Sequence, residues 1–316
     1  MTLARAVERL LIGTSLTMRQ LRHEVMTFAP HNVAVLIEGP TGSGKELVAQ
    51  ALHLTSRRTG SLVSVNMCAI PPETFESELF GHVQGSFTGA IRDRGGLFSE
   101  GDRGTVFPDE VGGLPRDLQA KLLRVIETKR FRAVGGSREQ ASDFRVLAAA
   151  NEPLDGEVLA GRFRQDLFFR LRALRIQVPT LAARREDIAA LAEHFLAEDW
   201  QLTSSQLKVD ALAVLERYDW PGNVRELRHV LGAARLRAAS GVISADDIRA
   251  VLVDHAGGDT EVLRRDAGRL GLMGALERNG WSIQAAAAEL GIDRTTVYRR
   301  LRRLGIARSM ASQNTM

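Results

Sequence analysis

The sequence predicts an α/β fold with a mainly parallel sheet, followed by two all-helical regions, and three observations carry this prediction. Apolar, β-branched segments alternate with helix-forming segments up to Pro179, which is typical of a parallel sheet covered by helices on both faces. The first such segment, residues 33–38, leads into a glycine-rich loop and then a helix-forming stretch. Beyond Pro179 only helical periodicity remains.

The composition is that of an ordinary globular protein with a basic C-terminal end. The chain has 316 residues, of which 44% are hydrophobic and 25% charged. Residues 257–316 hold 10 arginines and 6 acidic residues, so the whole net charge of +4 lies where a nucleic-acid partner would require it. The chain lacks a signal-peptide pattern and any apolar run of the ~20 residues that span a bilayer, so we expect a cytoplasmic protein. The single cysteine, Cys68, excludes an internal disulfide framework and is expected to be a small buried side chain.

The sheet is predicted from five short segments. Ahead of the first, residues 3–28 have the periodicity of one or two amphipathic helices with a break at residues 11–13. The predicted strands are residues 33–38, 61–66, 104–107, 144–150 and 174–178. Ligands of such sheets lie at the carboxyl ends of the strands. The polar residues expected at that edge are Asn66, Asp109, Glu110 and Asn151.

The glycine-rich loop has the pattern of a phosphate-binding loop. Glycines allow the backbone N–H groups to curve around an anion, and the following helix directs its positive end at the same anion. Lys45 supplies a mobile charge for the outer phosphates, while Glu46 stands where a hydroxyl would contact Mg²⁺. The predicted nucleotide-binding residues of this loop are Gly39, Pro40, Thr41, Gly42, Ser43, Gly44, Lys45 and Glu46.

A second acidic element follows about 65 residues downstream, in the segment T-V-F-P-D-E. Beside a phosphate-binding loop, Asp109 is suited to hold Mg²⁺ and Glu110 to polarise the attacking water. We therefore expect a nucleoside triphosphatase that uses Mg²⁺. Pro108 removes a ladder N–H and is disfavoured in a central strand, and it immediately precedes Asp109, so the sequence leaves open whether it weakens hydrolysis.

The helical regions divide into two. Residues 186–200, 209–218, 224–239 and 244–254 are predicted helices of a small all-α unit, followed by a linker that begins at His255. At the C-terminus, residues 282–290 and 294–304 flank a tight turn at Gly291 and predict a helix-turn-helix. The residues expected to contact DNA are Arg294, Thr295, Thr296, Tyr298, Arg299 and Arg302.

Several long motifs together resemble one family. These are G-P-T-G-S-G-K-E, E-S-E-L-F-G-H followed by G-S-F-T-G-A, F-R-Q-D-L-F-F-R-L and W-P-G-N-V-R-E-L. The chain resembles the sigma-54-dependent transcriptional activators, which are bacterial enhancer-binding proteins of the AAA+ superfamily, from residue 11 to residue 306. The family's own loop carries Glu after the lysine, which accounts for Glu46. The resemblance implies an AAA+ α/β subdomain at residues 1–178, a helical lid at 179–254, a linker at 255–266 and a Fis-type domain at 267–316, without an N-terminal regulatory domain.

The resemblance also implies roles for individual residues. Asn66 would pair with Glu110, Asn151 would be the sensor I residue with Ala150 replacing the usual Thr beside it, and Arg225 would be the sensor II residue. Arg164 and Arg170 would be arginine fingers that reach the nucleotide of a neighbouring subunit, and Ile12 and Gly13 would contact the nucleotide. The implied sigma-54 contacts are Gly85, Ser86, Phe87, Thr88, Gly89 and Ala90.

The implied function is an ATP-dependent activator that binds double-stranded enhancer DNA and remodels sigma-54 RNA polymerase to open promoters. It would assemble from dimers to a hexameric ring, and control would come from a partner protein acting in trans, from expression level or from nothing. The alternative is a nucleotide-sensing DNA-binding regulator that does not remodel sigma-54, for which Pro108, Ala150 and Ser86 argue. A DNA-directed motor of the wider AAA+ group, such as a helicase loader, is a third possibility. The G-S-F-T-G-A segment favours the first function.

Overall fold

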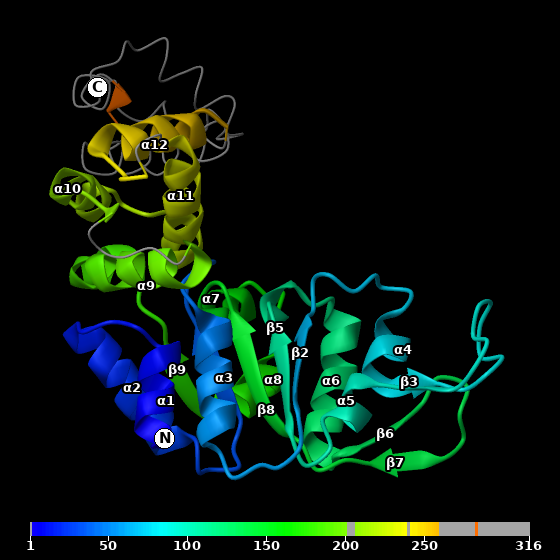
Figure 1. The fold of residues 1–316 in the computed structure, drawn as a ribbon. Coiled ribbons are helices and arrows are strands. Elements are labelled where there is room, and N and C mark those ends of the chain that lie inside the picture. The colour runs from blue at the N-terminus through cyan, green and yellow to red at the C-terminus, as the bar shows by residue number, and fades with distance from the viewer. Residues whose placement is uncertain (1, 201–205, 239–240, 259–281, 284–316) are drawn as a thin grey trace, which may run out of the picture. The chain divides into compact units, whose positions relative to one another are not determined.

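The computed structural model describes residues 2–200, 206–238, 241–258 and 282–283 (Figure 1). The chain divides into two compact units, Met1–Ile248 and Arg249–Met316. In chain order the elements are α1 (Leu3–Leu10), α2 (Leu16–Phe28), β1 (Val35–Glu38), α3 (Lys45–Thr55), β2 (Leu62–Asn66), α4 (Phe75–Phe80), β3 (Gly81–His82), β4 (Arg94–Gly95), α5 (Leu97–Glu100), β5 (Thr105–Asp109), η1 (Val111–Gly113), α6 (Arg116–Thr128), β6 (Arg130–Arg132), β7 (Glu139–Ala141), β8 (Arg145–Ala150), α7 (Leu154–Leu159), α8 (Gln165–Leu171), β9 (Leu174–Gln177), η2 (Leu181–Asp187), α9 (Ile188–Trp200), α10 (Val209–Arg217), α11 (Asn223–Arg237) and α12 (Ala245–Gly258).

The centre of the first unit is a five-stranded parallel sheet, which confirms the predicted fold class. The strand order is β2-β5-β8-β1-β9, and every pairing within it is parallel. All five predicted strands are present, with ends that differ from the prediction by two residues at most. The strand β1 lies between β8 and the edge strand β9, so the loop that follows it begins at the carboxyl edge of the sheet, beside the end of β8.

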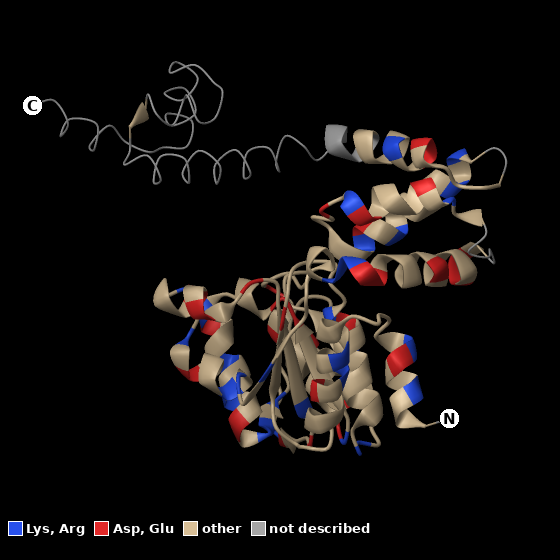
Figure 2. Cartoon of the chain, turned by 90° about the vertical axis from the view of Figure 1, so that its left-hand side faces the viewer, with Lys and Arg blue, Asp and Glu red and all other residues tan. Residues whose placement is uncertain are grey.

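The sheet is buried on both faces because successive side chains of each strand alternate between two cores. On β1, Leu36 belongs to one hydrophobic cluster, whereas Val35 and Ile37 belong to the other. The cluster with Val35 and Ile37 includes side chains of α1, α2 and α3, and the cluster with Leu36 includes those of α4, α6 and α8. Lys, Arg, Asp and Glu are found mainly on helices and loops, while the central strands are mostly uncharged (Figure 2). The packing therefore fixes the strands from both sides.

Pro108 is accommodated in β5, although proline is disfavoured in a central strand. Thr105 N donates to Ser61 O and Asp109 O accepts from Met67 N, the two residues that flank β2, so the alternation of a strand turns the nitrogen of Pro108 toward β8. On that side the pairing with β8 covers only Thr105 and Val106. The missing N–H thus falls beyond the end of this ladder, and β5 continues to Asp109, whose carbonyl accepts from Met67 N at 2.9 Å.

We therefore expect Pro108→Val to leave ATP turnover within about three-fold of the parent, because the new N–H regains no ladder bond and the backbone change acts on stability instead. The measurement is steady-state hydrolysis at saturating ATP, with thermal unfolding in parallel. A gain of tenfold or more in turnover would show that the proline displaces Asp109 after all.

The helical segments after the sheet agree with the prediction except at one boundary. The short helix η2 has Thr180 as its N-cap, whose hydroxyl accepts from Ala183 N at 3.2 Å, and α9 follows directly. The helix α12 continues to Gly258, so the predicted start of the linker at His255 is wrong: residues 255–258 are helical. Both predicted helices of the helix-turn-helix lie outside the described residues, apart from Ser282 and Ile283. Among the described residues, no helix is long and apolar enough to cross a bilayer.

Candidate nucleotide site

The loop between β1 and α3 has the backbone that an anion requires. Gly42 and Gly44 have φ of 76° and 107°, values at which glycine is favoured over other residues. Gly44 is the N-cap of α3, so the unsatisfied N–H groups of that helix face the loop. A Cβ on Gly44 would have no atom within 4 Å, which leaves open space at the helix end. The loop can thus receive a phosphate on its backbone.

Lys45 is fixed below this loop. Its Nζ donates to Gly39 O at 2.8 Å, to Pro40 O at 3.2 Å and to Asn151 Oδ1 at 2.6 Å. The residue is only 7% exposed. Burial lowers the Lys45 pKa, and the carboxylates of Asp109 and Glu110 oppose that shift. All three ammonium protons therefore have acceptors before any ligand arrives.

The acidic pair stands at the end of β5, beside the lysine. Asp109 Oδ1 accepts from Glu110 N at 2.9 Å, and burial raises the Asp109 pKa. Glu110 has left-handed backbone angles of φ 58° and ψ 42°, which turn its side chain away from the strand direction. Its Oε1 accepts from Asn151 Nδ2 at 3.1 Å. That hydrogen bond is the main reason why the Glu110 pKa lies below its usual value. The carboxylate is therefore held ionised and oriented.

Asn66 and Cys68 complete this edge of the sheet. Asn66 also lowers the pKa of Glu110, so the two side chains lie together, while Asn66 Oδ1 accepts from Cys68 N at 2.9 Å. The direct bond from an asparagine to Glu110 Oε1 comes from Asn151. Cys68 is exposed, so the expectation of a buried thiol is wrong. Its Sγ lies 3.6 Å from Glu110 O, because residues 67–69 form a turn at the site instead of continuing the strand into the core.

The W-P-G-N-V-R-E-L segment bonds the lid to the phosphate-binding loop. Asn223 is 2% exposed; its Nδ2 donates to Thr41 O at 3.1 Å and its Oδ1 accepts from Leu181 N at 2.9 Å. Gly42 O accepts from the N–H of Val224 and of Arg225, at 3.0 and 3.3 Å. The charge of Arg225 contributes to lowering the Lys45 pKa, which places this arginine beside the loop.

A cavity of about 220 Å³ adjoins the loop, and Ile12, Ser43 and Arg184 are among its lining residues. Gly13, with φ of 144°, packs against Asp187, where an added Cβ would meet Oδ2 at 2.5 Å. Asp187 is fully buried and accepts from Thr14 N, Ser15 N and Ser15 Oγ at 2.6 to 2.8 Å. The cavity has the position and apolar lining suited to a nucleobase.

The structure adds three residues at this junction that the sequence analysis does not predict: Asn223, Arg184 and Asp187. For Asn223 a local signal exists, because the Trp-Pro-Gly directly before it predicts a tight turn. Arg184 is 4% exposed and donates to Ser43 O at 3.2 Å. Arg184 and Asp187 look like surface charges in the sequence, because their partners lie more than 140 residues away.

The two predicted arginine fingers lie on α8 or directly before it. Arg164 forms a two-bond pair with Asp166, at 3.0 and 2.7 Å. Arg170 is exposed and forms no hydrogen bond or ion pair with any residue that the structure describes. Neither arginine bonds to the phosphate-binding loop or to the acidic pair of its own chain within the described bonds.

The G-S-F-T-G-A segment is an exposed loop between β3 and β4. Gly85 N donates to Ala90 O at 2.9 Å and Ala90 N to Phe87 O at 3.0 Å, so the backbone closes on itself. The ring of Phe87 lies edge-on at 5.0 Å from that of His82 and is 43% exposed, and Ile91 is 82% exposed. Two large apolar side chains thus face solvent on one loop, which marks a contact surface. The predicted DNA-contacting residues, Arg294 to Arg302, lie outside the described residues.

In this site the lid bonds to the phosphate-binding loop, and Lys45 of that loop bonds to the strand-end residue Asn151 close to the charges of Asp109 and Glu110. This arrangement is that of an AAA+ ATPase, and residues 182–263 match the AAA+ ATPase lid domain. Residues 11–177 match the Sigma-54 interaction domain, and residues 272–304 match the Fis family of bacterial regulatory proteins. The chain belongs to the sigma-54 interaction family of AAA+ ATPases.

Individual relatives agree with this assignment. The chain is 44% identical over 316 residues to the response regulator protein PilR of Pseudomonas aeruginosa, a match that covers 95% of this chain and 71% of PilR. It is 40% identical over 302 residues to the transcriptional regulatory protein ZraR of Salmonella typhimurium, covering 93% and 68%. Crystal structures of NtrX from Brucella abortus with ADP and with ATP are similar at TM-scores of 0.70 and 36% identity, covering 96% of this chain and 71% and 72% of NtrX.

Proposed function

We propose that this protein is an ATP-driven activator that binds enhancer DNA and remodels sigma-54 RNA polymerase so that promoters open. The observation that carries the proposal is the exposed loop between β3 and β4, with Phe87 and Ile91 in solvent on the same α/β unit as the nucleotide site. A hydrolysing site alone fits many AAA+ functions, whereas this loop is the part that a sigma-54 contact requires. Gly85, Ser86, Phe87, Thr88, Gly89 and Ala90 form that contact.

The nucleotide would bind with its phosphates on residues 39–46 and its base in the cavity lined by Ile12. Lys45 binds the outer phosphates, and Arg225 contacts them from the lid. Glu110 orients the attacking water and accepts its proton. Asp109 and Mg²⁺ fit each other, because Mg²⁺ is held by one or two carboxylates with phosphates and waters, and Asp109 Oδ2 has no partner among the described residues. The ion would neutralise charge on the phosphates.

Neither predicted arginine finger bonds to the nucleotide site of its own chain within the described residues, so a neighbouring subunit would supply this arginine. Arg164 and Arg170 have no bond to the nucleotide loop of the same subunit, so we assign them to the γ-phosphate of a neighbour, where an arginine finger is worth ~10³–10⁵ in rate. This places the active form in a ring, proposed to be a hexamer built from dimers. DNA contacts would come from Arg294, Thr295, Thr296, Tyr298, Arg299 and Arg302, and the protein would act in the cytoplasm with a regulatory partner in trans.

The test is promoter melting by sigma-54 holoenzyme with this protein and ATP, using Phe87→Ala and the control Leu159→Ala. Leu159 is 89% exposed on α7, so the control removes another solvent-facing apolar side chain elsewhere on the unit. We expect at least about a ten-fold loss of melting with Phe87→Ala, typical of truncating an aromatic contact, with ATPase activity retained. The control should melt normally. DNA binding without melting in the parent protein would instead identify a nucleotide-sensing regulator.

A further inference from the structure

A second cavity lies at the end of the sheet opposite to the nucleotide site. Its volume is about 200 Å³, and it is lined by residues that precede or begin three strands: Ala34 before β1, Arg145 at the start of β8 and Ala173 before β9. Lys129, at the end of α6, and Arg170, on α8, complete its lining. A space of this size accommodates a tetrahedral oxyanion with water molecules.

Lys129 brings an incompletely satisfied ammonium to this cavity. Its Nζ donates to Phe144 O at 2.8 Å and lies 3.6 Å from the centre of the Phe144 ring. An ammonium has three N–H donors, and this is the single hydrogen bond that the described residues offer it. Burial lowers the Lys129 pKa to about 8, and repulsion from Arg170 and Arg58 adds to the shift. Two of the three ammonium protons therefore have no acceptor among the described residues.

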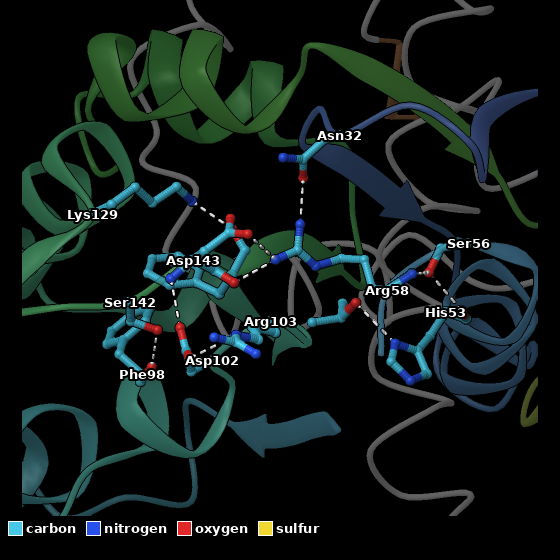
Figure 3. A network of polar contacts seen from close by, with 12 residues as sticks. Asn32, His53, Ser56, Arg58, Phe98, Asp102, Arg103, Lys129, Ser142 and Asp143 are labelled. Atoms are coloured by element: carbon cyan, nitrogen blue, oxygen red, sulfur yellow. Dashed lines mark hydrogen bonds and ion pairs between the residues drawn. The ribbon is translucent and has the colours of Figure 1, made fainter. Parts of the chain in front are cut away.

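The carboxylate nearest to Lys129, that of Asp143, forms an ion pair with another residue, Arg58. Asp143 pairs with Arg58, at 3.0 Å between the carboxylate and Nη2, and Arg58 also donates to Asn32 Oδ1 at 3.0 Å. Figure 3 shows Lys129 and Arg58 approaching the Asp143 segment from opposite sides. Asp143 raises the Lys129 pKa only in part against the burial effect. The cavity thus keeps an excess of positive charge.

Two arginines add to this excess. Arg145 is 2% exposed and donates to three backbone carbonyls, those of Val33, Ala29 and Phe28, at 2.8 to 3.1 Å. Burial lowers its pKa to about 10, and it has no carboxylate within ion-pair distance among the described residues. Arg170 has no bonded partner there either. Three cations around one cavity repel one another unless an anion lies between them.

We propose that this cavity binds a small oxyanion, with inorganic phosphate, the product of ATP hydrolysis, as its source in the cell, and that the bound anion retains Arg170 in its own subunit. The binding of an oxyanion is argued from the cavity and its charges alone. The retention of Arg170 rests on the proposed function, in which Arg170 reaches the nucleotide of a neighbouring subunit. The Arg170 guanidinium cannot bind the phosphate in this cavity and the γ-phosphate of the neighbouring subunit at the same time. Phosphate bound in the cavity would therefore slow ATP hydrolysis in the adjacent subunit.

The binding test is a titration with inorganic phosphate, followed by calorimetry, on the full chain with the nucleotide loop saturated by ADP. Two variants address the cavity: Lys129→Met removes one charge, and Ala173→Glu adds an opposing charge at the exposed rim without removing a buried group. Lys121→Met is the matched control, because Lys121 lies on the same helix and pairs with Glu76 on the surface. A parallel titration with sulfate distinguishes oxyanion chemistry in general from phosphate in particular.

We expect the phosphate dissociation constant to rise by about ten-fold or more in both cavity variants, the effect of one unit charge in a partly buried site, and to stay within about two-fold in Lys121→Met. Equal affinities in all four proteins, or no saturable binding in the parent, would overturn the proposal. Steady-state ATPase activity should then fall with phosphate in the parent at saturating ATP but not in Lys129→Met. Identical inhibition in both would refute the link to Arg170, while a complete lack of ATPase activity would refute the proposed function and leave the binding result intact.

Discussion

Replacing Glu110 by Gln is expected to lower ATP turnover by about 10²–10⁴-fold, the range over which a positioned base contributes to rate. The isosteric amide keeps a hydrogen bond to Asn151 possible but is a far weaker acceptor for the proton of the attacking water. The pKa of Glu110 lies below its usual value because of Asn151 first and Asn66 further, so the carboxylate is fully ionised at neutral pH in the parent. ATP binding should be retained, because the phosphates bind to residues 39–45 and not to Glu110.

The measurement is hydrolysis together with the dissociation constants of ATP and ADP, and the control is Glu127→Gln. Glu127 is an exposed carboxylate on α6, so this change removes the same charge away from the site. Turnover within ten-fold of the parent in Glu110→Gln would remove Glu110 from its role as the base. A loss of both binding and turnover would mean that Glu110 supports the loop instead.

Replacing Gly42 by Ala is expected to separate the lid from the phosphate-binding loop. A Cβ on Gly42 would lie 2.3 Å from Gly222 O, a backbone atom that cannot rotate away, and the residue has φ of 76°. The same glycine accepts two N–H groups of the lid, so the clash falls where the two parts are bonded. We expect a loss of about 2–4 kcal/mol in unfolding free energy, because a left-handed alanine costs 1–2 kcal/mol before the clash is counted.

Gly44→Ala is the matched control for this prediction. Gly44 has a φ of 107°, so it carries a comparable backbone strain, yet its added Cβ meets nothing within 4 Å. In thermal or denaturant unfolding without nucleotide, Gly44→Ala should therefore lose only the strain, about 1–2 kcal/mol. Equal losses in the two variants would show that the contact with Gly222 contributes nothing to stability.

Local pattern was sufficient for the strands and for the placement of the polar residues at their ends. Asn66, Asp109, Glu110 and Asn151 follow from where apolar runs stop, because parallel strands bring their carboxyl ends to one edge. The ion pair of Arg164 with Asp166 does not follow from their spacing, because residues two apart do not face one another on a helix; it depends on the extended backbone of Arg164 at the N-cap. The residue type of Pro108 alone predicts a disturbed strand, whereas its effect depends on which neighbouring strand its nitrogen faces.

The remaining features depend on contacts between distant parts of the chain. The contact of Gly42 with Gly222 and the bond from Asn223 to Thr41 join segments about 180 residues apart. The periodicity of apolar residues in the sequence does not predict such long-range contacts. The exposure of Cys68 depends on a turn just beyond β2, where the strand pattern has already ended. That Asn151 donates to Glu110 Oε1 depends on side-chain directions, which the ends of the strands leave undetermined.

The three acceptors of Lys45 turn nucleotide binding into an exchange reaction. An ammonium whose three protons are all engaged can take a phosphate oxygen only by releasing one present acceptor, and of the three only Asn151 Oδ1 belongs to a side chain that can rotate. The same carboxamide donates to Glu110. Displacing it from the lysine frees the asparagine to reorient, and with it the carboxylate. We therefore expect ATP binding to reorient Asn151 and, through its bond to Glu110, to change the orientation of that carboxylate.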